Sequence, residues 1–207
     1  MSKEQAHWDS VYEKLPAGGG SWARKSVKES INAIQRVAPR VPCVMIDIGG
    51  AGSDIGDYVA YDDGHCYILD ISSAALGIRD ERRNEWQTIY GVSTSLCAGD
   101  VLSAPLPMVE LWHDRATMHF LTNPKDRRKY VQRAAEHIVP GGGIVVSGFS
   151  TEGPTHCSGL EVLRRSPDEL AEEFAEFFDR IDSYESDHIT PSGAVQRFAW
   201  YLGKRKS

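Results

Sequence analysis

A short apolar strand followed at once by a glycine-rich turn constrains the fold of this chain more than any other feature. Residues 44–48 read VMIDI and follow Pro42, and four of the next eight residues are glycine. Near-continuous apolar runs are typical of strands buried on both faces of a parallel sheet, and glycine lets the backbone turn close to a ligand. The pattern predicts the first strand of an α/β sheet, then a tight turn and a helix N-terminus that faces a ligand. The alternative is a tight strand–helix turn that binds nothing.

The remainder of the chain alternates short apolar runs with amphipathic stretches, which indicates further strands and helices of an α/β fold. Asn123-Pro124 and Ser166-Pro167 are helix start signals. Alternating apolar residues at 196–202 predict a final strand that pairs with its predecessor in an antiparallel hairpin. The other predicted elements are helices ending near 37 and spanning 124–138 and 167–177, strands at 66–69, 95–98, 109–112 and 144–149, and a turn at 140–143.

The composition argues against several classes of function. The chain has 207 residues, 41% of them apolar, which suits one globular domain. Its 23 basic and 29 acidic residues give a net charge of −6, which disfavours nucleic-acid and membrane-surface binding. No apolar run approaches the ~18–20 residues of a membrane span, and the polar N-terminus does not read as a secretory signal, so we expect a cytoplasmic protein. The four cysteines lack paired spacing, and Cys43, Cys66 and Cys97 are expected to be buried, so no metal site is predicted.

Three aspartates follow predicted strands: Asp47, Asp70 and Asp100. Because the carboxyl ends of parallel strands meet at one edge of a sheet, we expect these side chains to line one ligand site. Asp70 follows Asp47 by 23 residues, close to the ~20 at which an acidic side chain binds ribose in Rossmann-like sheets. The alternative for Asp70 is a helix cap at the strand end.

Two kinds of nucleotide ligand fit the glycine-rich turn. Gly50, Gly52 and Gly56 spell a loose form of the dinucleotide fingerprint, which would indicate NAD or NADP. Asp47 precedes the first glycine, where a carboxylate would repel a pyrophosphate but could accept a hydrogen bond from an ammonium group. A zwitterionic cofactor therefore suits the turn better.

The order of these motifs resembles that of the class I S-adenosylmethionine-dependent methyltransferases. The matching segments span residues 41–150 and are DIGGAG at 47–52, Asp70, AGDV at 98–101 and IVPGGGIVV at 138–146. Further segments resemble a bacterial subgroup of small methyltransferases and extend the match over nearly the whole chain: 7–12, 21–22, 111–121 and 153–160. The chain departs from the usual pattern in its turn, where GGAGS replaces a more open Gly-x-Gly-x-Gly.

The resemblance implies a Rossmann-like α/β fold with a seven-stranded, mostly parallel sheet, helices on both faces and an antiparallel C-terminal hairpin. It also implies a single methyltransferase domain over residues 1–207. Within that domain, residues 1–40 are expected to cap the cofactor site and residues 41–150 to bind the cofactor. Residues 151–207 would supply an acceptor-side loop, a helix and the final hairpin.

The resemblance implies S-adenosyl-L-methionine as the cofactor. The glycine turn would cradle its methionine part, with Asp47 facing the amino group, Asp70 the ribose and Asp100 the adenine. Tyr12 and Trp22 would place aromatic rings beside the sulfonium; alternatively, they clasp the N-terminal segment onto the sheet. The predicted cofactor-binding residues are Tyr12, Trp22, Asp47, Gly49, Gly50, Gly52, Asp70, Ile71, Asp100, Val101 and His113.

Candidate catalytic residues follow the fourth predicted strand, namely His113, Asp114 and His119. A histidine with a pKa near 7 could remove a proton from the acceptor, and the resemblance places His119 facing the cofactor. The alternative for His119 is a packing role beside Phe120. Arg115 could either pair with a neighbouring carboxylate or touch the substrate.

The segment 150–165 is longer than a strand–helix connection requires, and we expect it to form part of an acceptor pocket. Its candidate residues are His156, Cys157, Arg164 and Arg165. An arginine there could bind a carboxylate or phosphate of the substrate. The alternative is a solvated loop with basic residues.

These features predict a methyltransferase that acts on a small-molecule acceptor by in-line transfer, with no metal and no covalent intermediate. Three alternatives stay open: a protein lysine methyltransferase, an NAD(P)-dependent oxidoreductase and a non-catalytic cofactor-binding protein. The oxidoreductase is disfavoured because no tyrosine is followed four residues later by lysine, as in a common reductase pair. The expected partner is a small molecule, not a nucleic acid or a membrane, and the sequence assigns no oligomeric state.

Overall fold

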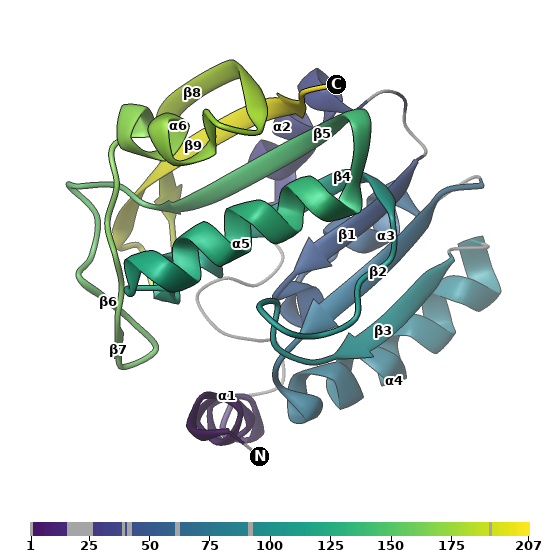
Figure 1. Ribbon diagram of the computed structural model, residues 1–207. Helices are drawn as coiled ribbons and strands as arrows, with labels where there is room; N and C mark the ends of the chain where they lie inside the picture. Colours follow the sequence, from purple (N-terminus) through teal and green to yellow (C-terminus); the bar gives the residue numbers. More distant parts are fainter. Residues whose placement is uncertain are drawn as a thin grey trace.

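The computed structural model describes residues 2–15, 27–38, 40, 43–60, 63–90, 93–190 and 192–207, with backbone only from 82 to 90. Its centre is a seven-stranded sheet in the order β3-β2-β1-β4-β5-β9-β8 (Figure 1). The first five strands in this order run parallel, β9 is antiparallel to β5, and β8 is antiparallel to β9. The strands are β1 (Val44–Ile48), β2 (His65–Asp70), β3 (Thr94–Ala98), β4 (Val109–Arg115), β5 (Ile138–Phe149), β8 (Phe178–Ile189) and β9 (Val195–Arg205), and a separate small sheet holds β6 (His156–Cys157) and β7 (Leu160–Glu161).

The predicted sheet and its C-terminal hairpin are confirmed, with one difference in β5. Residues 140–143, predicted as a turn, lie within this strand. Gly141 adopts a φ of +75°, and the ladder between β4 and β5 shifts its register just before Gly143. Such an irregularity bends a strand without ending it. The glycines therefore extend β5 backwards to Ile138.

Helices cover both faces of the sheet, as predicted (Figure 1). Three of them, α2, α3 and α4, pack on one face, and α5 and α6 pack on the other. None of the helices in the described ranges is both long and apolar enough to cross a membrane. The helices are α1 (Lys3–Glu13), α2 (Val27–Val37), α3 (Ile55–Val59), α4 (Ser73–Tyr90), α5 (Pro124–His137) and α6 (Pro167–Phe174), with short 3-10 turns η1 (Gly50–Gly52) and η2 (Met118–Phe120).

Two helices begin where the sequence predicts. The Asn123 side chain accepts a hydrogen bond from the Lys125 N–H (2.9 Å), and Ser166 and Glu169 form a capping box at the start of α6. Each such cap contributes about 1 kcal/mol to helix stability. Helix α6 ends three residues earlier than predicted, because the chain must turn to begin β8 at Phe178.

Alternation along β1 sets the position of Asp47. Met45 packs in the core on the α2 side of the sheet, while Ile46 and Ile48 pack on the α5 side. Because side chains alternate between faces, Asp47 lies on the same face as Met45, near the carboxyl end of the strand. A buried strand thus carries one charged side chain, and that side chain stands at the edge where the turn begins.

A buried hydrogen-bond network fixes the end of β4. The Asp114 carboxylate accepts hydrogen bonds from the N–H groups of Thr117 (2.9 Å) and Met118 (3.0 Å) and from the Tyr130 hydroxyl (2.6 Å). The Trp112 indole N–H donates to the same hydroxyl (2.9 Å). Asp114 is fully buried, and this burial raises its pKa to about 6. The network ties β4 to η2 and to α5, so it holds the chain that follows β4 in place.

Replacing Tyr130 with phenylalanine should measurably destabilise the fold. The change removes one donor to the buried Asp114 carboxylate and the acceptor of the Trp112 N–H. We expect the free energy of unfolding to fall by about 1–3 kcal/mol, as for other unsatisfied buried groups, in urea denaturation followed by circular dichroism. Tyr58→Phe is the matched control, because within the described ranges the Tyr58 hydroxyl bonds to the Gln35 side chain alone, in a more exposed setting. If the two variants had the same free energy of unfolding, the network around Asp114 would not stabilise the fold as we expect.

Candidate functional site

A pocket of about 740 Å³ lies at the carboxyl ends of the parallel strands. Its wall comes from the segments that follow β1 to β5, from α1 and from the β6–β7 hairpin. Figure 1 shows α1 and this hairpin at the end of the sheet toward which the parallel strands point. Open α/β sheets bind ligands at this edge, and the volume falls within the ~300–1,000 Å³ of small-molecule sites.

The glycine turn brings the backbone directly against Asp47. Gly49 adopts a φ of +66°, and its N–H donates to the Leu69 carbonyl (2.7 Å). A Cβ on Gly49 would overlap the Thr117 side chain, and a Cβ on Gly50 would overlap the Asp47 carboxylate. Both positions therefore require glycine, which gives a physical reason for the GGAGS sequence of this turn.

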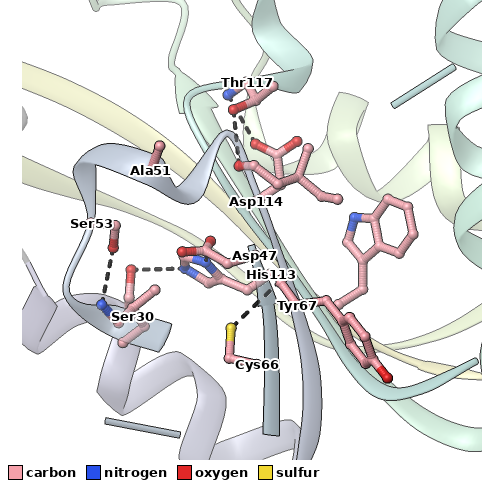
Figure 2. Close-up of polar contacts among 12 residues, drawn as sticks. Ser30, Asp47, Ala51, Ser53, Cys66, Tyr67, His113, Asp114 and Thr117 are labelled. Atoms are coloured by element: carbon pink, nitrogen blue, oxygen red, sulfur yellow. Dashed lines mark hydrogen bonds and ion pairs between the residues drawn. The ribbon is translucent and has the colours of Figure 1, made fainter. Parts of the chain in front are cut away.

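Asp47 forms a buried pair with His113. The two residues lie opposite each other in the β1–β4 register, and Asp47 Oδ1 lies 2.7 Å from His113 Nδ1. The other ring nitrogen of His113 lies 3.0 Å from the Ser30 hydroxyl of α2, as Figure 2 shows. Asp47 Oδ2 is buried and has no hydrogen-bond partner in the part of the chain described. A buried carboxylate oxygen of this kind requires a donor, and Asp47 lines the pocket from which one could come.

Asp70 lies next to the turn at the end of β2. Its carboxylate accepts hydrogen bonds from the N–H groups of Ala51 (3.3 Å) and Ser72 (2.9 Å). Burial raises its pKa to about 6, and the nearby negative charges of Asp47 and Asp9 act in the same direction. The carboxylate also lines the pocket, so its remaining lone pairs can accept hydrogen bonds from ligand hydroxyl groups.

Asp9 attaches α1 to the rim of the site. Its carboxylate accepts hydrogen bonds from the Ser72 hydroxyl (2.7 Å) and from the Ala74 N–H (3.0 Å) at the start of α4. These contacts lower the pKa of Asp9. Since Ser72 also donates its N–H to Asp70, α1 is linked through one residue to the carboxylate beside the turn.

Asp100 follows β3 at the same edge. Its Oδ1 accepts a hydrogen bond from the Leu102 N–H (2.8 Å), and the side chain is otherwise exposed. Val101 and Ile71 line the pocket beside it, so apolar surface and a carboxylate lie together at this end. A flat ring with an exocyclic amino group suits such a combination.

The structure brings most of the predicted cofactor-binding residues to one pocket. Trp22 lies outside the described residues. The members that line the pocket are Tyr12, Asp47, Gly49, Gly50, Gly52, Asp70, Ile71, Asp100, Val101 and His113.

His119 and Asp114, two of the predicted catalytic residues, do not line the pocket. The His119 ring is buried between Phe120 and Phe149, with centroid distances of 4.4 and 5.0 Å. Burial lowers the pKa of His119 to about 3, so the ring is neutral at physiological pH. Asp114 is occupied by the network at the end of β4. Both side chains therefore point away from this pocket: η2 holds His119 against Phe149, and alternation along β4 places Asp114 on the opposite face of the sheet from His113.

The loop of residues 150–165 reaches the pocket through only part of its length. Cys157 lines the wall, and burial raises the pKa of its thiol. Arg164 donates instead to the carbonyls of Thr151 (2.7 Å) and Gly153 (3.1 Å), and Arg165 pairs with a glutamate of α6. His156 is exposed outside the pocket. Neither arginine lines this pocket, and both make contacts within the loop or with α6.

Sequence reasoning missed Ser30 as a polar partner within the site. Ser30 lies on α2, far from His113 in the sequence, so no local sequence pattern indicates that the two side chains meet. In the described ranges, no group of three or more histidine, cysteine or carboxylate side chains is arranged to hold a metal. The polar groups of the pocket instead suit an organic ligand with hydroxyl and amino groups.

Comparison by sequence identifies no relative, since no protein-family model and no curated protein matches the chain. Solved structures do resemble it. A 1,6-didemethyltoxoflavin-N1-methyltransferase of Burkholderia thailandensis, with bound 1,6-didemethyltoxoflavin and S-adenosylhomocysteine, superposes with a TM-score of 0.74 at 17% identity, covering 99% of this chain and 88% of that one.

Two further structures give similar agreement. The CcbJ methyltransferase of Streptomyces caelestis has a TM-score of 0.72 at 13% identity, with full coverage of both chains. A protein that converts a disulfide bond into a thioacetal group during echinomycin biosynthesis has a TM-score of 0.75 at 16% identity, covering 98% of this chain and 92% of that one. Together with the strand order and the glycine turn, these likenesses identify the architecture: the chain has the fold of the class I S-adenosylmethionine-dependent methyltransferases.

Proposed function

We propose that this protein is a methyltransferase that uses S-adenosyl-L-methionine and acts on a small-molecule acceptor by in-line transfer. One observation carries the proposal: the glycine turn and three strand-end aspartates, Asp47, Asp70 and Asp100, line a single pocket of a methyltransferase fold. Two of these carboxylates, Asp47 and Asp70, are buried, and burying them side by side is costly unless a ligand donates hydrogen bonds to them.

The residues present fit this cofactor. The partnerless Oδ2 of Asp47 would accept a hydrogen bond from the amino group, and the glycines of the turn let the backbone lie close to the methionine part. Asp70 would accept hydrogen bonds from the ribose hydroxyls, and Asp100 from the adenine amino group. Tyr12 would lie beside the sulfonium, where an aromatic face contributes about 0.5–2 kcal/mol.

The residues of this chain contribute to the reaction by positioning the cofactor and the acceptor. S-Adenosylmethionine supplies a methyl group on a sulfonium, and the acceptor must approach that carbon in line. Both ring nitrogens of His113 are engaged, one by Asp47 and one by Ser30. We therefore assign His113 to orienting Asp47, and we do not assign it the role of a base that removes the acceptor proton.

Two further features support this function over the alternatives. A dinucleotide would place a pyrophosphate near the buried carboxylate of Asp47, which would repel it. The helix α1 and the β6–β7 hairpin narrow the acceptor side of the pocket, which favours a small molecule over a folded protein substrate.

The position of α1 supports the division into a cap (1–40), a cofactor-binding core (41–150) and an acceptor side (151–207). The net negative charge disfavours nucleic-acid and membrane partners, the free thiols support a cytoplasmic location, and the motif resemblance supports a bacterial origin.

Calorimetry tests the cofactor assignment directly. We expect S-adenosylmethionine and S-adenosylhomocysteine each to bind with a Kd of about 50 µM or tighter, whereas NADPH does not bind. A mass-spectrometric search for methylated products in a metabolite mixture would then identify the acceptor. Absence of binding by both adenosyl compounds would rule out the proposed function, and binding without any product would favour a non-catalytic binding protein.

Removing the Asp70 carboxylate should weaken cofactor binding strongly. Asp70→Ala deletes hydrogen bonds between a charged group and the ribose, so we expect the Kd for S-adenosylhomocysteine to rise at least tenfold, in line with about 1.5–3 kcal/mol for such bonds. Asp168→Ala is the control, because the Asp168 side chain is 80% exposed and, in the part of the chain that the structure describes, pairs with Arg180 alone. An unchanged Kd for Asp70→Ala would mean that the ribose binds elsewhere.

Cofactor affinity should depend on pH through Asp70. Because burial raises its pKa to about 6, the ionised carboxylate that accepts hydrogen bonds from ribose is fully present only above that value. We expect the Kd for S-adenosylhomocysteine to be constant above pH 7 and to rise as the pH falls from 7 to 5, by up to about tenfold per unit.

The Asp70→Asn variant controls this titration. It should bind weakly at every pH and show no step near pH 6. Asp114, whose pKa is also raised to about 6, is present in both proteins, so the difference between them isolates Asp70. Identical pH dependence in the two proteins would assign the step to another group.

A further inference from the structure

The pocket extends beyond the residues assigned to the cofactor. Asp70 lies at the end of β2 and Asp100 follows β3, so both stand on one side of β1 in the sheet order. Strands β4, β5 and β9 lie on the other side of β1. The pocket lining on that side includes Phe120, which follows β4, Phe149 at the end of β5 and Phe198 on β9. An acceptor placed beside the cofactor would therefore meet aromatic rings.

One face of helix α1 adds a further aromatic ring to this lining. Glu4, Trp8 and Tyr12 are spaced by four residues, which places them on one face of the helix, and all three line the pocket. The Trp8 ring contacts the Phe120 ring with a centroid distance of 5.0 Å. Trp8 is half-buried, so part of its surface is accessible from the pocket that it lines.

Polar contacts on two sides hold α1 in this position. Every residue of α1 is at least partly exposed, so burial alone would hold the helix weakly. Asp9 accepts hydrogen bonds from the start of α4, and His7 Nε2 donates to the carbonyl of Ser158 between β6 and β7 (3.0 Å). Figure 1 shows α1 between α4 and this hairpin. Trp8 lies between the two attachment points in the sequence, so its ring is held in place.

The aromatic rings form two nearly perpendicular pairs. The planes of Trp8 and Phe120 make an angle of 75°, and those of Phe149 and Phe198 make an angle of 73° at a centroid distance of 5.0 Å. Each pair places the face of one ring next to the edge of another. A planar aromatic ligand can stack on a face while it also meets an edge, and both arrangements are favourable for aromatic rings. A saturated ring or a flexible chain gains only dispersion contacts from the same walls.

We propose that the acceptor is a small aromatic or heteroaromatic molecule whose ring packs against Trp8 and the phenylalanines at this end of the pocket. Trp8 is then a residue that determines acceptor specificity. This inference rests on the proposed methyltransferase function and names its substrate class. An ammonium group can also lie on an aromatic face, so a mimic of the lysine side chain belongs among the probes of the test.

The test uses four probes: benzamide, cyclohexanecarboxamide, heptanamide and n-butylamine. The three amides share one polar group and the same number of carbon atoms, and n-butylamine represents the lysine side chain. Each probe is titrated by ligand-observed NMR into the wild-type protein saturated with S-adenosylhomocysteine. We expect benzamide to bind about threefold or more tightly than each of the others. The two saturated amides are more apolar than benzamide, so the hydrophobic effect alone would give the reverse order.

Variants then assign the preference to Trp8. Trp8→Leu keeps an apolar side chain but removes the ring, so benzamide and cyclohexanecarboxamide should bind equally, while the Kd for S-adenosylhomocysteine changes less than about threefold. Trp8→Phe keeps a ring and should retain part of the preference. The control is Phe177→Leu, because Phe177 is also half-buried but packs on the α5 side of the sheet, outside the pocket. This control should behave as wild type in every titration.

The outcomes separate this inference from the function on which it rests. The inference is overturned if benzamide shows no binding at millimolar concentrations, or if any other probe binds at least as tightly. It is also overturned if Trp8→Leu keeps the full preference for benzamide, or if this variant loses S-adenosylhomocysteine as strongly as benzamide, because Trp8 would then contact the cofactor. If the wild-type protein fails to bind S-adenosylhomocysteine at all, the proposed function itself fails. Melting temperatures of the variants show whether each is folded before its titration is interpreted.

Discussion

The buried carboxylate of Asp47 is the constraint on which the rest of the site depends. Moving a carboxylate out of water is costly unless donors replace the lost hydration. His113 supplies a partner for one oxygen, while the second oxygen is buried against the backbone at Gly50 and has no hydrogen-bond partner among the described residues. The described residues therefore provide a hydrogen-bond partner for only one of the two Asp47 carboxylate oxygens, and an amino group of a ligand could donate to the other.

The surrounding structure keeps that carboxylate from relaxing. Parallel pairing of β1 with β4 sets His113 opposite Asp47, and Ser30 on α2 holds the far side of the ring. One residue further along β4, Asp114 fixes the strand end through the network with Tyr130. If the end of β4 were less rigid, the His113 imidazole could turn away from Asp47. Asp114 and Tyr130 do not line the pocket, yet they support the position of Asp47, which does.

The parts of this site that the sequence predicts are those with local signals. Short stretches of sequence are enough to recognise a buried strand, a glycine turn and an acidic residue at the end of a strand. The parallel topology then brings Asp47, Asp70 and Asp100 to one edge of the sheet. Side-chain direction after β4 has no such signal. Whether His119 faces a ligand or the core depends on the 3-10 turn η2 and on packing against Phe149. Partners such as Ser30 come from distant segments and follow only from the packed fold.

The carboxylates at the strand ends differ in how much each depends on a ligand. Asp100 is exposed, so its carboxylate needs no donor from a ligand. Asp70 is buried but already accepts hydrogen bonds from two backbone N–H groups. Asp47 Oδ2 is buried and has no hydrogen-bond partner among the described residues, so this oxygen has the greatest need for a donor. A ligand amino group would therefore contribute most at Asp47, whereas hydroxyl donors at Asp70 would add to hydrogen bonds that this carboxylate already accepts.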